Sequence, residues 1–116
     1  MHSNFADLHA QPKFKTDLEK GANLQCVCSQ GADADNFWVL DYVAWSYSGD
    51  PTNGKCTVKI GGTTVFEVDV TSGGPGLLNF EQHELYNAAQ TKNQALVVEL
   101  AAGGGSVVGK LQIRYR

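Results

Sequence analysis

The sequence predicts an all-β protein that folds as a single β-sandwich, jelly-roll-like, with seven to eight antiparallel strands. Apolar and polar residues alternate in several short segments, which is the period of half-buried strands. Glycine-rich turn signals separate these segments, and no convincing long helix lies between them. The Cys-Trp-Cys spacing of antibody domains is absent, so we favour a jelly roll over an immunoglobulin-like sandwich. A length of 116 residues suits one domain.

The first 20 residues alternate little and carry isolated apolar side chains among charged ones. We expect residues 1–20 to form an extended N-terminal arm and residues 21–116 to form the sandwich domain. A short amphipathic helix over residues 13–20, stopped by Gly21, is the alternative for the end of the arm. The first strand is expected over residues 22–29, with Cys26 and Cys28 facing inward.

Residues 30–36 are rich in Asp, Asn and Gly, which predicts a turn. The Asp33-x-Asp35 spacing suggests calcium, but the glycine and glutamate that complete an EF-hand loop are missing. A solvated turn is therefore the favoured interpretation.

Residues 37–47 are apolar at nearly every position, which is typical of a strand covered on both faces. Alternation places Trp38 and Tyr42 on one face and Trp45 and Tyr47 on the other. These four rings therefore cannot form one sugar-binding platform without a bulge. Packing in a core or an interface is the favoured role.

Residues 45–76 predict a β-meander. The alternating segments 56–60 and 66–70 are joined by Gly61 and Gly62, which suit a primed turn because glycine tolerates positive φ at both positions. Gly74, Pro75 and Gly76 predict a second loop, followed by a short strand over residues 77–80.

The C-terminal segments 96–100 and 107–115 alternate cleanly, and Gly103 to Gly105 predict a hairpin between them. In the last strand, Val108, Lys110, Gln112, Arg114 and Arg116 share one face. The segment 104–110 matches G-x-x-x-x-G-K but lacks the following Ser or Thr and the helix of a phosphate loop. A long regular strand at a sheet edge would promote aggregation, and an oligomer would cover it.

The composition excludes several classes of function. The net charge is −3 and there is no run of Lys or Arg, which argues against nucleic acid and anionic membranes as partners. No apolar stretch is long enough to span a membrane, and the N-terminus lacks the regions of a signal peptide. We therefore expect synthesis in a reducing cytoplasm.

No cofactor or metal site is expected. The three cysteines lack zinc-ligand spacing and are interpreted as buried, inert thiols. His83, which lies between Gln82 and Glu84, is the best acid–base candidate, but no nucleophile motif accompanies it. We therefore expect that the protein is not an enzyme.

Several turn and strand segments together resemble a pattern of small proteins from tailed bacteriophages and prophages. The segments are WSYSG (45–49), PT (51–52), GGT (61–63), VDV (68–70), GGPG (73–76) and GGSVVGKL (104–111). This resemblance covers about residues 38–116. It implies a virion protein made in the bacterial host cytoplasm, similar to the β-sandwich decoration or cement proteins of phage heads, which are usually trimeric.

Two functions follow as hypotheses. The first is a structural virion protein that stabilises the phage head as a homo-oligomer, with the major capsid protein or another virion protein as its partner. The second is a carbohydrate-binding or host-adhesion module of a phage particle. The candidate interface residues are the apolar groups of the arm and two aromatic residues of the strand 37–47, namely Phe5, Leu8, Phe14, Trp38 and Tyr42. The resemblance alone favours a trimer over a dimer.

Overall fold

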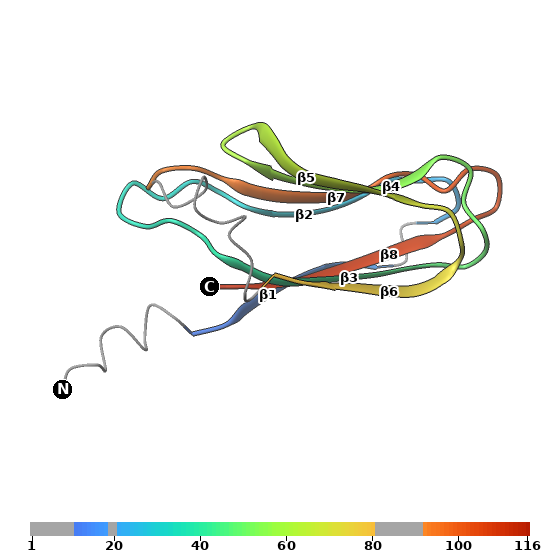
Figure 1. Cartoon of the computed structure of the whole chain (residues 1–116), viewed down its shortest axis with the longest axis horizontal. Coiled ribbons are helices and arrows are strands. Elements are labelled where there is room, and N and C mark those ends of the chain that lie inside the picture. Colours follow the sequence, from blue (N-terminus) through green and yellow to red (C-terminus); the bar gives the residue numbers. More distant parts are fainter. Residues whose placement is uncertain (1–10, 19–20, 81–91) are drawn as a thin grey trace.

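The computed structural model describes residues 11–18, 21–80 and 92–116, and it confirms an all-β sandwich. Figure 1 shows its two facing layers, each a four-stranded antiparallel sheet. The strands are β1 (Lys13–Asp17), β2 (Cys26–Gln30), β3 (Leu40–Tyr47), β4 (Gly54–Ile60), β5 (Thr63–Val70), β6 (Gly74–Asn79), β7 (Leu96–Leu100) and β8 (Gly109–Tyr115).

The strand order identifies the sandwich as a jelly roll. One sheet has the order β1-β8-β3-β6 and the other has the order β2-β7-β4-β5. Each strand is therefore followed by a strand of the other sheet, except at the β4–β5 hairpin, which stays within one sheet. This interleaved arrangement of eight strands in two sheets is the one the sequence predicts.

The turn at Gly61 and Gly62 lies where the sequence predicts it, with φ values of 58° and 85°. The wider meander is wrong, however, because β3 pairs with β6 and not with β4. Alternation reveals which residues point inward but does not reveal which strand lies beside which. Only the β4–β5 hairpin of the predicted meander stays within one sheet.

Gly74, Pro75 and Gly76 belong to β6 rather than to a loop, which corrects the prediction. Pro75 is tolerated because β6 lies at the edge of its sheet, where a missing backbone N–H breaks no ladder. Gly76 faces Trp45 across the strand pair, and a Cβ atom there would lie 2.4 Å from the indole ring. Glycine at this position makes room for a tryptophan in the sandwich.

Residues 13–17, which the sequence assigns to the arm, form β1 and pair with β8 over five residue pairs. The short helix is therefore wrong, and the sandwich begins at Lys13. Since β8 lies between β1 and β3, the last strand is not an edge strand. This removes one of the reasons for expecting an oligomer. Phe5 and Leu8 lie outside the described residues.

β7 and β8 do not form the predicted hairpin, because they lie in different sheets. β7 pairs with β2 and β4, whereas β8 pairs with β1 and β3. The glycine-rich segment between them is thus a crossover. It is held by a hydrogen bond from the backbone N–H of Gly104 to the side-chain oxygen of Asn23, at 2.9 Å.

The core lies between the sheets and contains all three cysteines, which are free thiols. Burial raises the pKa of the Cys56 thiol to about 12. Tyr47 points into the core, and its hydroxyl donates a hydrogen bond to the carbonyl oxygen of Ala101 at 2.7 Å.

No helix that could cross a membrane is found in the described part of the chain. His83 lies outside that part.

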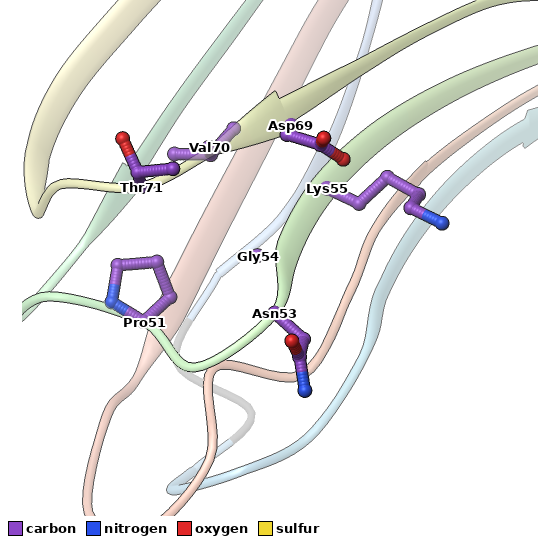
Figure 2. Close-up of a pocket in the computed structure, with 7 residues that line it drawn as sticks. All are labelled: Pro51, Asn53, Gly54, Lys55, Asp69, Val70 and Thr71. Atoms are coloured by element: carbon purple, nitrogen blue, oxygen red, sulfur yellow. The ribbon is translucent and has the colours of Figure 1, made fainter.

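At one corner of the sandwich, the connection between β3 and β4 meets the C-terminal end of β5. Figure 2 shows that this corner forms a surface pocket, with Pro51 and Thr71 on one side and Lys55 and Asp69 on the other. The volume of this corner pocket is about 430 Å³.

Candidate functional site

The two sheets present outer faces of different character. The outer face of β2-β7-β4-β5 is crossed by ion pairs between neighbouring strands. Lys59 pairs with Glu99 at 3.1 Å, and the Thr57 hydroxyl donates to Glu67 at 3.2 Å. Lys55 also lies 3.9 Å from Glu67. Charged groups that pair with one another in this way form an ordinary solvated surface.

The outer face of β1-β8-β3-β6, which we call the β3–β8 face, carries aromatic, apolar and uncharged polar groups beside arginine. Directly paired residues of neighbouring strands point to the same side of a sheet. The pairing therefore places the outward side chains of the four strands in two rows that run across the sheet. They are Phe14, Arg114, Tyr42 and Asn79 in the first row, and Thr16, Gln112, Ala44 and Leu77 in the second.

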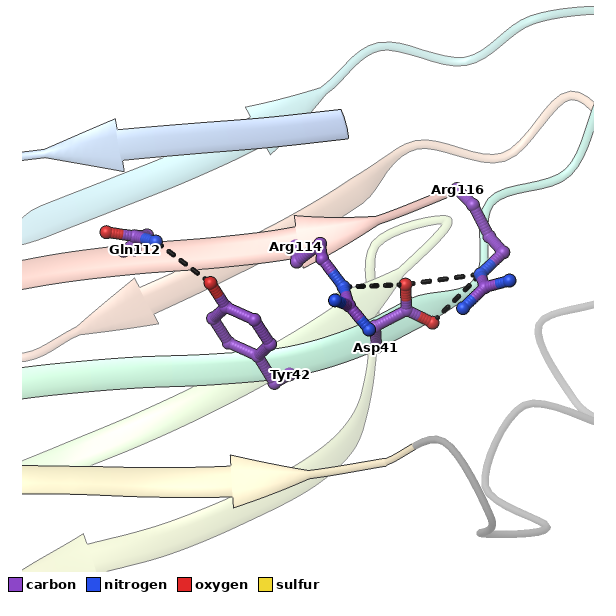
Figure 3. Close-up of polar contacts among 5 residues, drawn as sticks. All are labelled: Asp41, Tyr42, Gln112, Arg114 and Arg116. Carbon is purple, nitrogen blue, oxygen red and sulfur yellow. Dashed lines mark hydrogen bonds and ion pairs between the residues drawn. The ribbon is translucent and has the colours of Figure 1, made fainter. Parts of the chain in front are cut away.

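A bulge in β3 supplies a buried carboxylate to this face. The pairing between β3 and β8 shifts by one residue between Leu40 and Tyr42, which leaves Asp41 without a partner in the register. The Asp41 carboxylate accepts hydrogen bonds from Nε of Arg114 at 3.2 Å and from Nε of Arg116 at 3.1 Å (Figure 3). The side chain of Asp41 is only 2% exposed, so the two guanidinium groups shield it from water.

Tyr42 is fixed by contacts from β8. The guanidinium carbon of Arg114 lies 5.4 Å from the centre of the Tyr42 ring, which is a cation–π contact. The side-chain amide of Gln112 donates a hydrogen bond to the Tyr42 hydroxyl at 2.9 Å (Figure 3). Asp41, Arg114, Tyr42 and Gln112 thus form one connected network on the two central strands. The ring and the amide are held in place before any ligand arrives.

Large apolar groups lie at the margins of this face. Phe14 on the edge strand β1 is 55% exposed, and Leu77 on the edge strand β6 is 64% exposed. The central strands between them carry the polar network and the small side chain of Ala44. The face is therefore polar at its centre and apolar at two opposite edges.

The residues singled out from the sequence separate into two groups. Phe14 and Tyr42 lie in the same row of the β3–β8 face. Trp38 lies elsewhere, because β3 begins only at Leu40. Its indole N–H donates to the Gly31 carbonyl oxygen at 3.0 Å, and its ring meets Tyr115 edge-on at 5.9 Å. Trp38 thus packs against the core instead of joining Tyr42.

Sequence reasoning did not identify Asp41, Gln112 and Arg114 as site residues. The alternation of the last strand could have indicated two of them, because it places Gln112 and Arg114 together on the polar face of that strand. Asp41 carried no such signal, since its outward position depends on the bulge. Within the residues that the structure describes, no three His, Cys, Asp or Glu side chains are grouped so that they could hold a metal ion.

Comparisons with known proteins support the fold. No protein-family model matches the chain, and no curated protein matches it. The structure of PirA is similar at 12% identity and a TM-score of 0.50, over 89% of this chain and 92% of PirA. The latent form of PorU from Porphyromonas gingivalis is similar at 8% identity and the same TM-score, over 91% of this chain and 12% of PorU.

A carbohydrate-binding module of family CBM36, solved with calcium and xylotriose, is also similar at 15% identity and a TM-score of 0.41, over 92% of both chains. At these identities the likenesses to PirA and PorU show a shared β-sandwich fold and nothing about the ligand. The ligand has to be argued from the side chains of this chain.

Proposed function

We propose that the protein is a non-catalytic binding module that recognises an oligosaccharide on the β3–β8 face. The observation that carries this proposal is the fixed Tyr42 ring at the centre of a sheet face, with the polar ends of Gln112 and Arg114 beside it. Sugar rings combine apolar C–H faces with hydroxyl groups. An aromatic ring next to planar hydrogen-bonding side chains complements both features.

The network lowers the cost of binding. A ligand that must order long side chains loses about 0.5 to 1.5 kcal/mol for each one. On this face, Asp41 holds Arg114, and Gln112 holds Tyr42, before the ligand is present. The free energy gained from contacts with the ligand is therefore not offset by the cost of ordering these side chains.

The distribution of polarity favours a glycan over a permanent subunit interface. Such interfaces have an apolar centre and a polar rim. The β3–β8 face has the opposite arrangement, with Gln112 and Arg114 at its centre and Phe14 and Leu77 at its edges. A closely packed second subunit would bury the central polar groups without an apolar core around them.

The virion hypothesis is the second candidate, and one specific observation favours it. Phe14, Leu18 and Leu77 are all about half exposed or more, and exposed apolar groups of this size are typical of protein contacts. In this version, the protein docks on a phage head as a homo-oligomer, and these side chains contact the major capsid protein or another virion protein.

A glycan array followed by calorimetry tests the first proposal. We expect binding to at least one oligosaccharide, and Tyr42→Ala should weaken that binding at least tenfold because it removes the ring. Ser29→Ala, an exposed change on the other sheet, is the matched control and should bind like the unmodified protein. Circular dichroism must show that both variants are folded. Equal binding by the two variants would rule out this face as the glycan site.

Light scattering and particle fractionation test the second candidate. A homotrimer would have a mass near three times the 12.5 kDa of the chain, and the protein would be a stoichiometric component of purified particles. Replacing Leu77 by Ser should then reduce attachment to the particle. A monomer that is absent from particles would exclude the virion role.

A further inference from the structure

The corner pocket is a second place where this chain can hold a ligand, and it is separate from the β3–β8 face. It belongs to the other sheet, at the end of the β4–β5 hairpin opposite the Gly61–Gly62 turn. The pocket is lined by residues of the β3–β4 connection, of both strands of the hairpin and of the position after β5, namely Pro51, Asn53, Gly54, Lys55, Asp69, Val70 and Thr71 (Figure 2).

The backbone around the pocket is closely packed. Gly54 pairs with Val70 at the end of the hairpin and is buried. A Cβ atom on Gly54 would lie 2.5 Å from the Val70 carbonyl oxygen and 2.7 Å from Cγ of Pro51. Asn53 has a φ of 60°, in the left-handed region that asparagine tolerates better than most residues. These features give the pocket a fixed wall.

The polar side chains of the pocket have unused hydrogen-bonding capacity. Asn53, Asp69 and Thr71 make no side-chain hydrogen bond or ion pair with any residue that the structure describes. Lys55 has only a distant partner in Glu67, at 3.9 Å, and both of those side chains are almost half exposed. The pocket is therefore lined by residues that carry a carboxylate, an ammonium, an amide and a hydroxyl.

We propose that this pocket binds one neutral, polyhydroxylated ligand, that is, a single sugar residue. Lys55 and Asp69 are direct cross-strand neighbours, so their charges balance and the pocket offers no net charge to an ionic ligand. The carboxylate accepts hydrogen bonds from adjacent hydroxyl groups, whereas the ammonium and the amide donate them.

The size and the apolar wall agree with this ligand. Pockets that hold small molecules start at about 300 Å³, so a pocket of about 430 Å³ suits a ligand the size of one sugar ring. The ring of Pro51 offers an apolar surface to the C–H groups of the sugar. The mixture of apolar wall and polar groups is the one such sites use for orientation and specificity.

Titration of the ¹⁵N-labelled protein with a panel of neutral monosaccharides tests the proposal. We expect the backbone amide signals of Asn53, Gly54 and Thr71 to shift with at least one sugar. Asp69→Asn removes the charge but keeps the shape, and Asn53→Gly removes the amide but keeps the positive φ. Each change should weaken binding at least fivefold.

Two controls show whether the response is specific to the pocket. Ser29→Ala should leave the monosaccharide affinity unchanged, because Ser29 pairs with Val97 towards the Gly61–Gly62 end of the sheet, away from the pocket. Inorganic phosphate and acetate should produce no shift at the pocket amides. Three outcomes would overturn the proposal. The shifts persist unchanged in both pocket variants, or the anions cause them instead of the sugars. The third is that no sugar causes a shift at 50-fold excess over roughly millimolar protein.

Discussion

The buried ion pair of Asp41 gives the sharpest stability prediction, because the chain contains a close match to it on the other sheet. Asp41 and Glu99 each lie 3.1 Å from a cationic nitrogen, of Arg116 and Lys59 respectively. The side chain of Asp41 is 2% exposed, whereas that of Glu99 is 24% exposed. The two carboxylates therefore differ in burial, and also in the number of cationic partners, which are Arg114 and Arg116 for Asp41 and Lys59 for Glu99. Replacement by the neutral amide, Asp41→Asn and Glu99→Gln, removes each charge and keeps the shape.

The expected effects differ in size. Breaking a buried ion pair from one side costs about 3 to 5 kcal/mol because the remaining charge is left without compensation. The side chains of Arg114 and Arg116 are 28% and 36% exposed, so water recovers part of that cost. We expect Asp41→Asn to lower the free energy of unfolding by about 2 to 4 kcal/mol. Glu99→Gln should lower it by at most about 1 kcal/mol.

Urea denaturation followed by tryptophan fluorescence measures both variants. With a slope of about 2 kcal/mol per molar urea, Asp41→Asn should lower the midpoint by about 1 to 2 M and Glu99→Gln by at most about 0.5 M. Added salt should hardly change the difference, since the Asp41 carboxylate is shielded from solvent. Equal midpoint shifts for the two variants would refute the argument that burial decides the strength of these pairs.

Two further changes test the core. Gly76→Ala should destabilise the fold by about 1 to 3 kcal/mol, because its new methyl group must displace the Trp45 ring. Urea denaturation measures this change. Gly31→Ala is the control and should show almost no change, because its methyl group meets nothing within 4 Å. Burial raises the pKa of Cys56 from 9.0 to about 12, so the unfolded chain loses this proton first and stability should fall as the pH rises from 9 towards 12. Cys56→Ala should show a smaller fall over that range, and an identical pH profile would contradict the assignment.

Much of the fold could be predicted from local patterns. The inward positions of Cys26 and Cys28 and the turn at Gly61 and Gly62 depend on neighbouring residues only, and period-two alternation suffices to identify them. The pairing of β3 with β6 could not be predicted in this way, because many residues separate the two strands and alternation carries no information about partners. The same limit explains the incorrect hairpin between β7 and β8.

The candidate site was less accessible to sequence reasoning. Phe14 was singled out as an isolated apolar residue of the arm, and Tyr42 as an aromatic residue of the segment 37–47. Their common row requires β1, β8 and β3 to be neighbours. Asp41 would have been assigned to the face opposite Tyr42 by alternation. The bulge places both side chains on one face, and no residue pattern in the segment indicates it. The corner pocket likewise depends on a loop and a strand that are distant in sequence.

The pairing of β1 with β8 has a consequence for how the protein is made. Lys13 lies opposite Tyr115, so this strand pair joins the two ends of the described chain. Loops of that length close slowly, and contacts between distant segments delay folding. Ribosomal synthesis releases β8 last, which means that β1 has no partner strand until translation of the domain is complete. Because Phe14 comes from β1 and Arg114 from β8, the row that holds both side chains forms only after β8 has left the ribosome.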